Sequence, residues 1–377
     1  MVEARRKVLF ISAPVGAGHV RAARATGAAL VRLAPDVAAE FANVFDFFSP
    51  RLGRAILGVY LKILEVFPQA YGMAYGWGNS SRLALAGRAL VSRYLAGRME
   101  RYIAALGPDA VVVTHATPAG LVAHLLASDR LRLPTAAVVT DYVVHRLWVY
   151  PELDRYFVAN EALRDYLAEH GVAKASSRAL GIPLAEGFAA PVDKAAAIEK
   201  LGLAAGRPTV LIMGGGAGVL PMGEIVADLD SLGLPLQLIA VAGRNAALER
   251  KLHTQAAALK HVTLRPLGFV DNVHELMAAA DLLISKPGGL TAAEALACGL
   301  PMVIYRPIPG QEEANTRFLT ASGAAVRVGA VAELTVRTAE LLADRDGRLA
   351  AMAAAAKALG RPQAAEAVAG EILAMLK

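Results

Sequence analysis

Short, strongly apolar runs alternate with longer alanine-rich or amphipathic stretches along the 377-residue chain. The apolar runs have the length of strands, and the stretches between them are long enough to form helices. The expected strands lie at 7–14, 109–116, 135–141, 155–160, 209–216, 236–243, 281–289 and 301–305. Such an alternation is typical of parallel sheets whose strands are joined by crossover helices. The pattern therefore predicts an α/β fold.

The strands fall into two series, which predict two doubly wound domains. The stretch between them, 181–197, is rich in Pro, Gly and Ala, as a domain join is expected to be. The chain is also longer than one hydrophobic core usually supports. We expect an N-terminal domain at 1–184 and a C-terminal domain at 185–377. The last helical stretch, at about 363–376, is left open between the two domains, with packing back on the N-terminal one as an alternative.

Composition narrows the class of protein. Hydrophobic residues make up 55% of the chain and charged residues 19%, which disfavours disorder. The chain has no apolar run near the ~20 residues that a membrane-spanning helix needs, and its first residues are expected to form a strand rather than a targeting segment. The single cysteine, Cys298, excludes an internal disulfide and a cysteine-cluster metal site. A reducing, cytoplasmic setting is therefore expected.

Positive charge is concentrated in one segment. Residues 51–101 carry eight Lys or Arg against two Glu, together with six aromatic residues, whereas the whole chain has a net charge of +6. A basic, aromatic and apolar segment suits an anionic partner, either lipid headgroups or nucleic acid. The alternative is a core helix with solvated arginines. The expected membrane contacts are Trp77, Arg82, Arg88 and Arg93.

Three glycine loops follow expected strands. They contain Gly16 and Gly18, then Gly214, Gly215 and Gly216, and then Gly288 and Gly289. In doubly wound sheets, ligands bind outside the carboxyl ends of the strands, where glycine amides and helix N-termini favour phosphate groups. None of the loops continues into Gly-Lys-Ser/Thr, so none is a P-loop. A tight strand–helix turn is the alternative reading of each.

The sequence gives little support for a metal site. The "DLD" at 228–230 lies in an expected helix rather than at a strand end, so a solvated helix face explains it. Neither His-x-x-x-His nor Cys-x-x-Cys occurs. We therefore expect no metal requirement and no bound cofactor.

Several segments together resemble the family 28 glycosyltransferases. They are "ISAPVGAGHVRAA", "TDYVVHRLWVYPELDRYFVANEALRDYLAEHGV", "LGIPL", "IMGGGAG" and "GFVDNVHELMAAADLLISKPGGLTAAEALACGLPMVIYRPIPGQEEANTRFL". The closest branch is that of the monogalactosyldiacylglycerol synthases and processive diacylglycerol glucosyltransferases. The resemblance implies a GT-B fold, in which two Rossmann-like domains face a cleft. It places a UDP-sugar on the C-terminal domain and a lipid acceptor on the N-terminal one.

The resemblance also assigns the polar residues of 291–312. It implies that Glu294 binds the ribose hydroxyls, because a carboxylate can accept from two hydroxyls at once. The alternative is that Thr291 and Glu294 form a capping box of the following helix. It implies that Gln311 and Glu312 contact the sugar hydroxyls, whereas a polar helix start is their simpler reading.

The remaining donor contacts follow from the same resemblance. The glycines of the second and third loops are expected to offer amides to the diphosphate, with added charge from Lys286. The main chain at Phe269 and Val270 is expected to hold uracil, while the side chains there pack. One departure concerns the "GIP" turn, where the family often has an arginine two residues after the proline and this chain has Ala185.

The acceptor side carries the expected catalytic residues. The resemblance makes His19 a general base or an orienting residue, since the pKa of imidazole lies near neutrality. The alternative is an imidazole that bonds a neighbouring carbonyl. Asp141 is expected to assist His19, and His115 and His145 to line the acceptor side with Gly16 and Gly18. Capping and packing are the alternatives for these residues.

Together these inferences predict an inverting glycosyltransferase that moves a hexose from a UDP-sugar to diacylglycerol. Its expected location is the cytoplasmic face of the membrane, where it would bind anionic lipids peripherally. An enzymatic alternative resembles lipid II synthase and uses UDP-N-acetylglucosamine, and a non-enzymatic one is a regulator that binds UDP-sugar. Nucleic acid is not expected as a partner, because its binding would explain neither Glu294 nor the three glycine loops.

Overall fold

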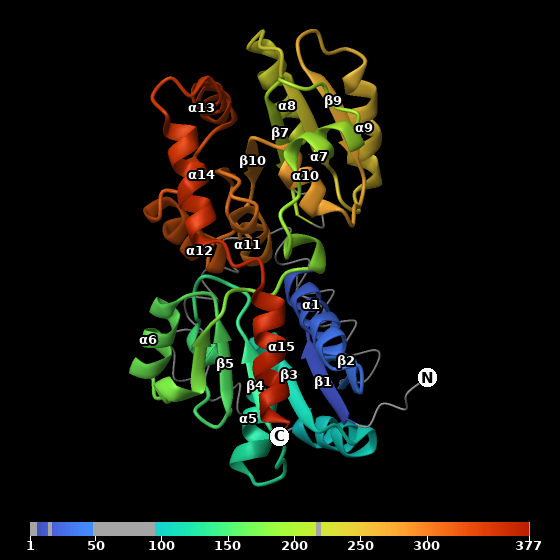
Figure 1. Cartoon of the computed structure of the whole chain (residues 1–377), viewed down its shortest axis with the longest axis vertical. Coiled ribbons are helices and arrows are strands. Elements are labelled where there is room, and N and C mark those ends of the chain that lie inside the picture. The colour runs from blue at the N-terminus through green and yellow to red at the C-terminus, as the bar shows by residue number, and fades with distance from the viewer. Residues whose placement is uncertain (1–5, 14–16, 48–94, 216–219, 377) are drawn as a thin grey trace. The chain divides into compact units, whose positions relative to one another are not determined.

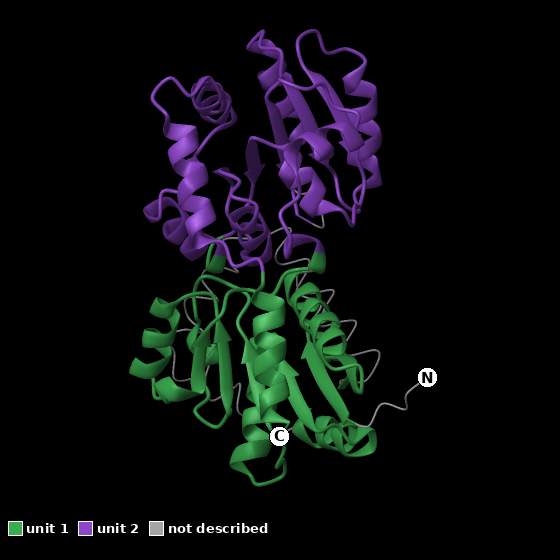
Figure 2. Ribbon diagram, in the orientation of Figure 1, with its two compact units in different colours: residues 1–186, 309–311, 363–377 green, residues 187–308, 312–362 purple. Residues whose placement is uncertain are grey.

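The computed structural model describes residues 6–13, 17–47, 95–215 and 220–376 of the chain. The chain divides into two compact units (Figure 2). Unit 1 comprises residues 1–186, 309–311 and 363–377, and unit 2 comprises residues 187–308 and 312–362. Each unit is built around one parallel sheet (Figure 1).

The sheet of unit 1 has six strands in the order β2-β1-β3-β4-β5-β6, and all neighbours are parallel. The strands are β1 (Arg6–Ser12), β2 (Val37–Asn43), β3 (Ala110–Val113), β4 (Thr135–Val138), β5 (Arg155–Val158) and β6 (Ser177–Ala179). In the central pair, Val8 of β1 lies opposite Ala110 of β3. The 2-1-3-4-5 start of this order is a known doubly wound arrangement, in which the switch point lies between the first and third strands.

Helices cover the sheet of unit 1. They are α1 (Ala17–Leu33), α5 (Ala116–Ala127), α6 (Glu161–Glu169) and α15 (Ala364–Met375), and residues 95–106 are also helical. Short 3-10 helices are η1 (Val44–Phe47), η2 (Arg146–Trp148), η3 (Lys174–Ser176) and η4 (Glu186–Phe188). The last helix, α15, buries Val368 and Ile372 in the same core as Val8 and Phe10 of β1. The helix therefore packs within unit 1, although the chain reaches it only after unit 2.

The sheet of unit 2 also has six parallel strands, in the order β12-β11-β10-β7-β8-β9. The strands are β7 (Thr209–Met213), β8 (Gln237–Val241), β9 (Thr263–Leu267), β10 (Leu282–Ser285), β11 (Met302–Tyr305) and β12 (Ala325–Val328). Counted from β7, this is the 3-2-1-4-5-6 order of the Rossmann fold. The switch point lies between β7 and β10.

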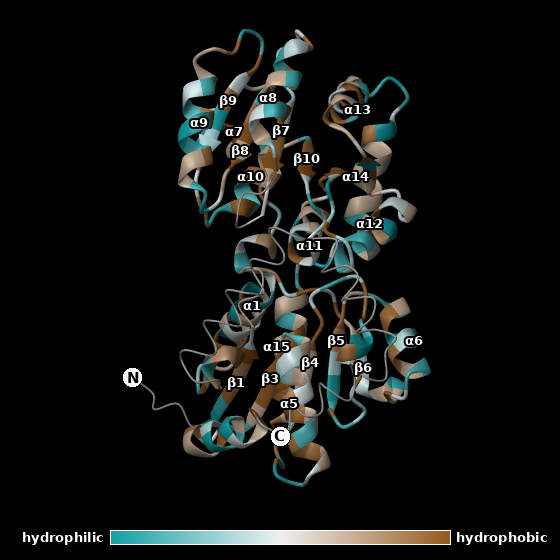
Figure 3. Cartoon of the chain, turned by 180° about the vertical axis from the view of Figure 1, so that it is seen from behind, coloured by the Kyte–Doolittle hydropathy of each residue, from teal (hydrophilic) through white to brown (hydrophobic). Residues whose placement is uncertain are grey.

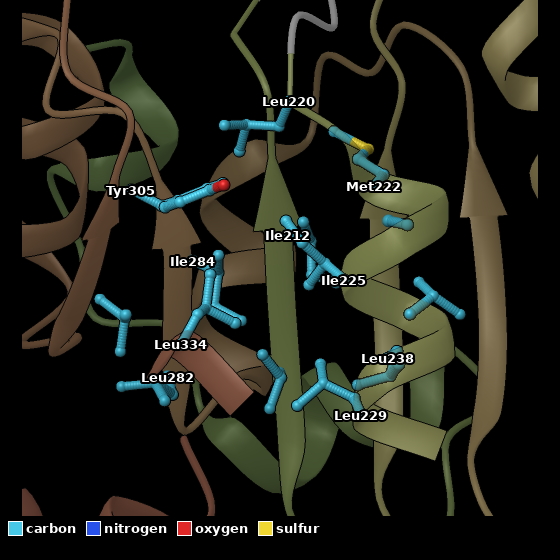
Figure 4. Close-up of a cluster of buried hydrophobic side chains, with 14 of the residues drawn as sticks. Ile212, Leu220, Met222, Ile225, Leu229, Leu238, Leu282, Ile284, Tyr305 and Leu334 are labelled. Atoms are coloured by element: carbon cyan, nitrogen blue, oxygen red, sulfur yellow. The ribbon is translucent and has the colours of Figure 1, made fainter. Parts of the chain in front are cut away.

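Eight helices of unit 2 connect and cover these strands. They are α7 (Lys194–Lys200), α8 (Met222–Ser231), α9 (Ala246–Ala256), α10 (Val273–Ala279), α11 (Gly289–Ala297), α12 (Gln311–Ala321), α13 (Val331–Ala343) and α14 (Arg348–Leu359). Strand side chains such as Ile212 and Ile284 pack against Ile225 of α8 and Leu334 of α13 (Figure 4). Hydropathy follows this arrangement, since the strands are largely apolar whereas the solvated helix α9 is largely hydrophilic (Figure 3). Burial of apolar strand residues on both faces is characteristic of parallel sheets.

All eight strands expected from the sequence are present, and the structure adds four that the sequence analysis missed. The missed strands are β2, β6, β9 and β12, which stand at the ends of the two described strand orders. Strands in that position bury less surface and contain more polar residues, as in "TLRPL" of β9 and "SRA" of β6.

Candidate active site

The two neighbouring central strands of unit 1 bring two histidines together. Ser12 ends β1, Thr114 follows β3, and their hydroxyl oxygens lie 2.8 Å apart in a buried hydrogen bond. Because the chain continues from β1 to β2 on one side and from β3 to β4 on the other, the carboxyl ends of β1 and β3 form the switch point of the sheet. His19 in the first turn of α1 and His115 before α5 meet there, with ring centroids 4.7 Å apart and ring planes at 88°.

His19 is held at this point by groups from two strand ends. Its Nδ1 lies 2.7 Å from the hydroxyl oxygen of Thr140, which follows β4. Burial lowers the pKa of His19 to about 4, against the opposing effect of a hydrogen bond with the Thr114 backbone. The imidazole is therefore neutral at physiological pH and keeps one unprotonated ring nitrogen. The sequence analysis did not identify Thr140, although its position directly before Asp141 at a strand end was a usable signal.

His115 has a fixed tautomer. It is the N-cap of α5, and its Nδ1 accepts a hydrogen bond of 3.1 Å from the Thr117 backbone N–H. A neutral ring that accepts at Nδ1 carries its proton at Nε2. Burial and the neighbouring His19 both lower the pKa of His115. The capping alternative therefore describes one of its contacts, and the edge-on packing against His19 describes another.

The other expected acceptor-side residues differ in their surroundings. His145 is buried and caps η2, where its Nδ1 accepts from the Leu147 backbone N–H at 3.1 Å. Asp141 is half-buried in the bend after Thr140, at the same carboxyl edge as His19. Gly18 lies in the first turn of α1. Gly16 and the expected membrane contacts Trp77, Arg82, Arg88 and Arg93 lie outside the described residues.

Unit 2 has a corresponding switch point between β7 and β10. The Ser285 hydroxyl at the end of β10 donates to the Met213 carbonyl at the end of β7, at 2.8 Å. Two of the expected glycine loops start here. Gly214 and Gly215 follow β7, and Gly215 has a φ of 73°, which a residue with a side chain rarely adopts. Gly216 lies outside the described residues.

The third glycine loop opens helix α11, and the alternative reading of Thr291 and Glu294 as a capping box is wrong. Gly288 is the N-cap and Gly289 the first helical residue, so Thr291 lies within the first turn of the helix and is not its N-cap. Glu294 lies further inside and is only 1% exposed. Its charge acts one turn along on Cys298, whose thiol pKa is raised to about 12 by burial and secondarily by Glu294. A carboxylate at this depth is costly to bury unless polar groups surround it.

Lys286 and Glu312 form an ion pair beside this loop. Lys286 Nζ lies 3.6 Å from Glu312 Oε1, and both side chains are 13% exposed. The second carboxylate oxygen, Oε2, accepts from the Ile308 backbone N–H at 2.7 Å. Burial raises the pKa of Glu312, which Lys286 opposes. Gln311, the first residue of α12, is half-buried next to Glu312. Because Glu312 partly neutralises Lys286, the charge of Lys286 is only partly available to a ligand.

Two further residues of α12 support the loop rather than line it. The amide of Asn315, which is fully buried, donates to the Pro287 carbonyl at 3.0 Å and so fixes the turn before Gly288. Glu313 forms a two-point contact with Arg327, at 2.7 and 2.8 Å. In "GQEEAN", neighbouring residues of α12 point in different directions, so Glu312, Glu313 and Asn315 each contact a different partner.

The loop after β9 differs from its expectation. The side chain of Phe269 was expected to pack, but it is 56% exposed. The guanidinium carbon of Arg244, from the loop after β8, lies 5.3 Å from the centre of its ring. Val270 follows on the same loop and is half-buried. An exposed aromatic ring beneath a cation offers a flat surface at the carboxyl edge of the sheet.

The "DLD" residues lie in helix α8, as the sequence predicts. Asp230 accepts from the backbone N–H groups of Lys260, His261 and Val262, so it fixes the turn before β9. In the described parts of the chain, acidic, histidine and cysteine side chains do not gather in threes as a metal site would need. Nor does any helix of those parts combine the length and apolar character needed to cross a bilayer.

Known structures define the class of this fold. MurG of Acinetobacter baumannii matches with a TM-score of 0.64 and 18% identity, covering 98% of this chain and 99% of that one. The glycosyltransferase SnogD from Streptomyces nogalater matches with a TM-score of 0.59 and 20% identity, covering 99% of each chain. The fold is therefore the GT-B fold, and the prediction of two Rossmann-like, doubly wound domains is confirmed.

Sequence relatives define the family. The family model described as monogalactosyldiacylglycerol (MGDG) synthase matches residues 19–184, and that of glycosyl transferases group 1 matches residues 224–358. A processive diacylglycerol beta-glucosyltransferase of Bacillus cereus (strain AH187) is 30% identical over 98% of this chain and 93% of its own length. The protein of that name from Bacillus pumilus (strain SAFR-032) is 29% identical over 90% of this chain and 88% of its own length. The chain belongs to this family of diacylglycerol glycosyltransferases, which confirms the resemblance.

Proposed function

We propose that the protein is an inverting glycosyltransferase that moves a hexose from a UDP-sugar to diacylglycerol. The observation that carries the proposal is the neutral His19, fixed by Thr140 at the switch point of unit 1. Unit 1 is also the part of the chain that matches the monogalactosyldiacylglycerol synthase model. The named activity of the relatives from Bacillus supports the same substrate pair.

In the proposed reaction, the acceptor hydroxyl attacks the anomeric carbon of the sugar from the face opposite UDP. The new carbon–oxygen bond forms as the bond to the phosphate oxygen breaks, and UDP leaves with the bonding electrons. The hydroxyl proton passes to the unprotonated ring nitrogen of His19, which then releases it to solvent. Thr140 orients the ring through Nδ1. Asp141, at the same edge, is proposed to favour the protonated ring as it forms.

The donor is proposed to bind along the carboxyl edge of unit 2. The main chain at Phe269 and Val270 would hold uracil, and Glu294 would accept from the ribose hydroxyls. Backbone amides of Gly214, Gly215, Gly288 and Gly289 would face the diphosphate, and Gln311 and Glu312 the sugar. The loops after β9 and β11, proposed for the uracil and the sugar, stand on opposite sides of the central strands β7 and β10 in the strand order, whose loops are proposed for the diphosphate.

The Lys286–Glu312 ion pair bears on how the sugar is held. Because Glu312 is fixed through Oε2 by the Ile308 N–H, its Oε1 is the oxygen that is shared between Lys286 and a sugar hydroxyl. A carboxylate oxygen can accept two hydrogen bonds, so the two roles are compatible. We propose that Lys286 keeps Glu312 ionised in its buried position, and that its direct contact with phosphate is secondary.

The acceptor is proposed to be reached from the cytoplasmic face of the membrane, with the protein bound peripherally. The basic and aromatic segment 51–101 supports this location, since anionic lipid contributes about 1 kcal/mol for each basic residue near its surface. No metal is assigned to the reaction. The leaving diphosphate is instead met by amide dipoles and side-chain cations of unit 2.

Product analysis tests the proposal. The protein is incubated with vesicles that contain either diacylglycerol or a polyprenyl-linked acceptor, together with radiolabelled UDP-glucose, UDP-galactose or UDP-N-acetylglucosamine, and the lipids are separated by thin-layer chromatography. The expected result is a labelled glycosyl-diacylglycerol with one of the two hexose donors. Label from UDP-N-acetylglucosamine on a polyprenyl-linked acceptor would instead favour the activity of a lipid II synthase. Binding of UDP-sugar without any product, for wild-type protein and with every acceptor, would favour the regulator.

A further inference from the structure

The residue after β11 has an unusual backbone conformation. Arg306 has a φ of 51°, in the left-handed region that residues with side chains rarely adopt. Pro307 follows it, which restricts the backbone of Arg306 further. Such conformations persist only where the surrounding structure imposes them, and they are frequent at binding sites. In this case the conformation decides where an arginine side chain lies.

The loop that carries Arg306 is fastened to the candidate donor site. Ile308, two residues on, donates its backbone N–H to Glu312 Oε2 at 2.7 Å. The other oxygen of that carboxylate faces Lys286 at the end of β10. One buried carboxylate therefore joins the loop after β11 to the loop after β10, so that Arg306 has a fixed place relative to both.

The guanidinium of Arg306 lies at the carboxyl edge of the sheet. Its central carbon is 5.2 Å from the centre of the Tyr305 ring. That ring is 2% exposed and belongs to the same core cluster as Leu220, which follows the glycine loop of β7. Figure 4 shows Tyr305 and Leu220 close together at the carboxyl ends of the strands. Stacking on a buried ring restrains a guanidinium that is otherwise exposed.

Among the described residues, the charge of Arg306 is not balanced by an ion pair, unlike that of Lys286. Within the ranges that the structure describes, no acidic side chain forms an ion pair with Arg306, whereas Lys286 is paired with Glu312. Arg244, the other cation noted at this edge, stacks on Phe269 beyond β8. That position is at the uracil end of the proposed donor path, so Arg244 is separated from the phosphates by the ribose.

A cation is needed where the diphosphate would lie. Lys286 is already paired with Glu312, and Arg244 stacks on Phe269 at the other end of the proposed donor path. We propose that Arg306 binds the diphosphate of the donor, chiefly the phosphate next to the sugar. This inference rests on the proposed donor site and adds to it the residue that balances the charge of the leaving group.

The proposal explains why the strain is retained. Glycine at 306 would adopt the observed φ without cost, so an arginine is kept there against the local backbone preference. A guanidinium that is already held in place loses less freedom on binding than a free side chain would, which favours affinity for a planar, charged oxygen group. The same charge would stabilise UDP as it departs.

Calorimetry with a series of nucleotides tests the assignment. UDP, UMP and uridine are titrated into wild type, Arg306→Gln, Arg306→Gly and the control Arg345→Gln, whose exposed arginine lies in the loop between α13 and α14. For both Arg306 variants we expect the affinity for UDP to fall about 10- to 100-fold, which corresponds to lost hydrogen bonds with a charged group. The affinity for UMP should fall less, and that for uridine should stay unchanged.

A second measurement separates binding from folding. Arg306→Gly should raise the melting temperature, because it relieves the strained backbone, while it weakens UDP binding as much as Arg306→Gln does. Equal losses for UDP and uridine, or unchanged UDP affinity in a variant whose wild-type parent binds UDP, would overturn the role of Arg306 alone. If wild type itself does not bind UDP, the donor site is overturned and this assignment with it.

Discussion

His19 stays in its base form across the physiological range because burial holds its pKa near 4. We expect His19→Ala to lower turnover by about 10²- to 10⁴-fold, as the loss of a general base does. The affinity for UDP should change little, since the donor residues are on the other unit. Turnover with a hexose donor and calorimetry with UDP measure the two effects. Near-normal turnover in the variant would move the role of base to another group, with Asp141 the next to be tested.

His19 and His115 make the free energy of unfolding depend on pH. Their folded pKa values lie below about 6.5, the value expected in the unfolded chain, so the unfolded state binds more protons. Their contribution is therefore complete above about pH 6.5 and is lost as the pH falls toward 4. Urea unfolding at several pH values should show this decrease, at no more than about 1.4 kcal/mol per pH unit for each site. His19→Gln should reduce the slope; an identical slope would contradict the assignment.

Glu294, which is 1% exposed, is proposed to bind the ribose hydroxyls. We expect Glu294→Gln to keep the fold, because the amide has the same shape, and to weaken UDP binding by about 1.5–3 kcal/mol. Thiol reactivity provides an internal control. Removing the charge should lower the pKa of Cys298, which Glu294 now raises. A variant with altered Cys298 reactivity but wild-type affinity for UDP would show that Glu294 does not hold the ribose.

At the level of helices, Gly360 and Gly370 allow a matched comparison of a crowded glycine with an uncrowded one. Gly360 ends α14 where a Cβ would lie 2.5 Å from the Leu296 carbonyl oxygen, so the backbones of α14 and α11 approach too closely for a side chain. Gly370 lies within α15, and a Cβ there meets nothing within 4 Å. We expect Gly360→Ala to destabilise the protein by about 1–3 kcal/mol, and Gly370→Ala to stabilise it by about 0.5–1 kcal/mol. Thermal unfolding measures both. Equal shifts of one sign would contradict the packing described for α11.

The hydrophobic pattern revealed the centre of each sheet better than its margins. Central strands such as β7, "TVLIM", are buried on both faces and therefore read as continuous apolar runs. Strands at the ends of the order need no such run, so β12, "AVRV", resembles an ordinary helix-to-helix connection. Turn and helix signals were similarly local: Thr291 and Glu294 fit a capping box, but the helix starts two residues before Thr291 because Gly288 and Gly289 already make the turn.

Single residues of the candidate site could be predicted from their position in the sequence, whereas contacts between residues far apart in the sequence could not. Residues such as His19 and Lys286 could be found because they directly follow an apolar run. Their contacts with Thr140 and Glu312 could not, because these residues reach them from distant strand ends, although Glu312 itself was predicted to contact the sugar. The contact of Phe269 with Arg244 was missed for the same reason, since Arg244 comes from a neighbouring loop.

For the whole molecule, the main expectation is membrane attachment through segment 51–101. Changing Arg82, Arg88 and Arg93 to Gln should release the protein from vesicles that contain anionic lipid, since three charges near the surface contribute about 1 kcal/mol each. High salt should do part of the same, because screening limits exposed charges to about 8–10 Å. Co-sedimentation on anionic and neutral vesicles measures the effect, and UDP affinity is the control. Equal pelleting of both proteins on both lipids would contradict it.

The last helix has a consequence for how the protein is made. During synthesis, the strands of unit 1 emerge from the ribosome first. Val368 and Ile372 of α15, which emerge last, belong to the core of that unit. All of unit 2 therefore emerges before unit 1 can close, and the apolar face that α15 covers, next to α1, stays open until then. Domains usually fold in the order of their synthesis, whereas here the first to appear is the last to be completed. We therefore expect a nascent chain halted at residue 362 to carry a folded unit 2 and a protease-sensitive unit 1.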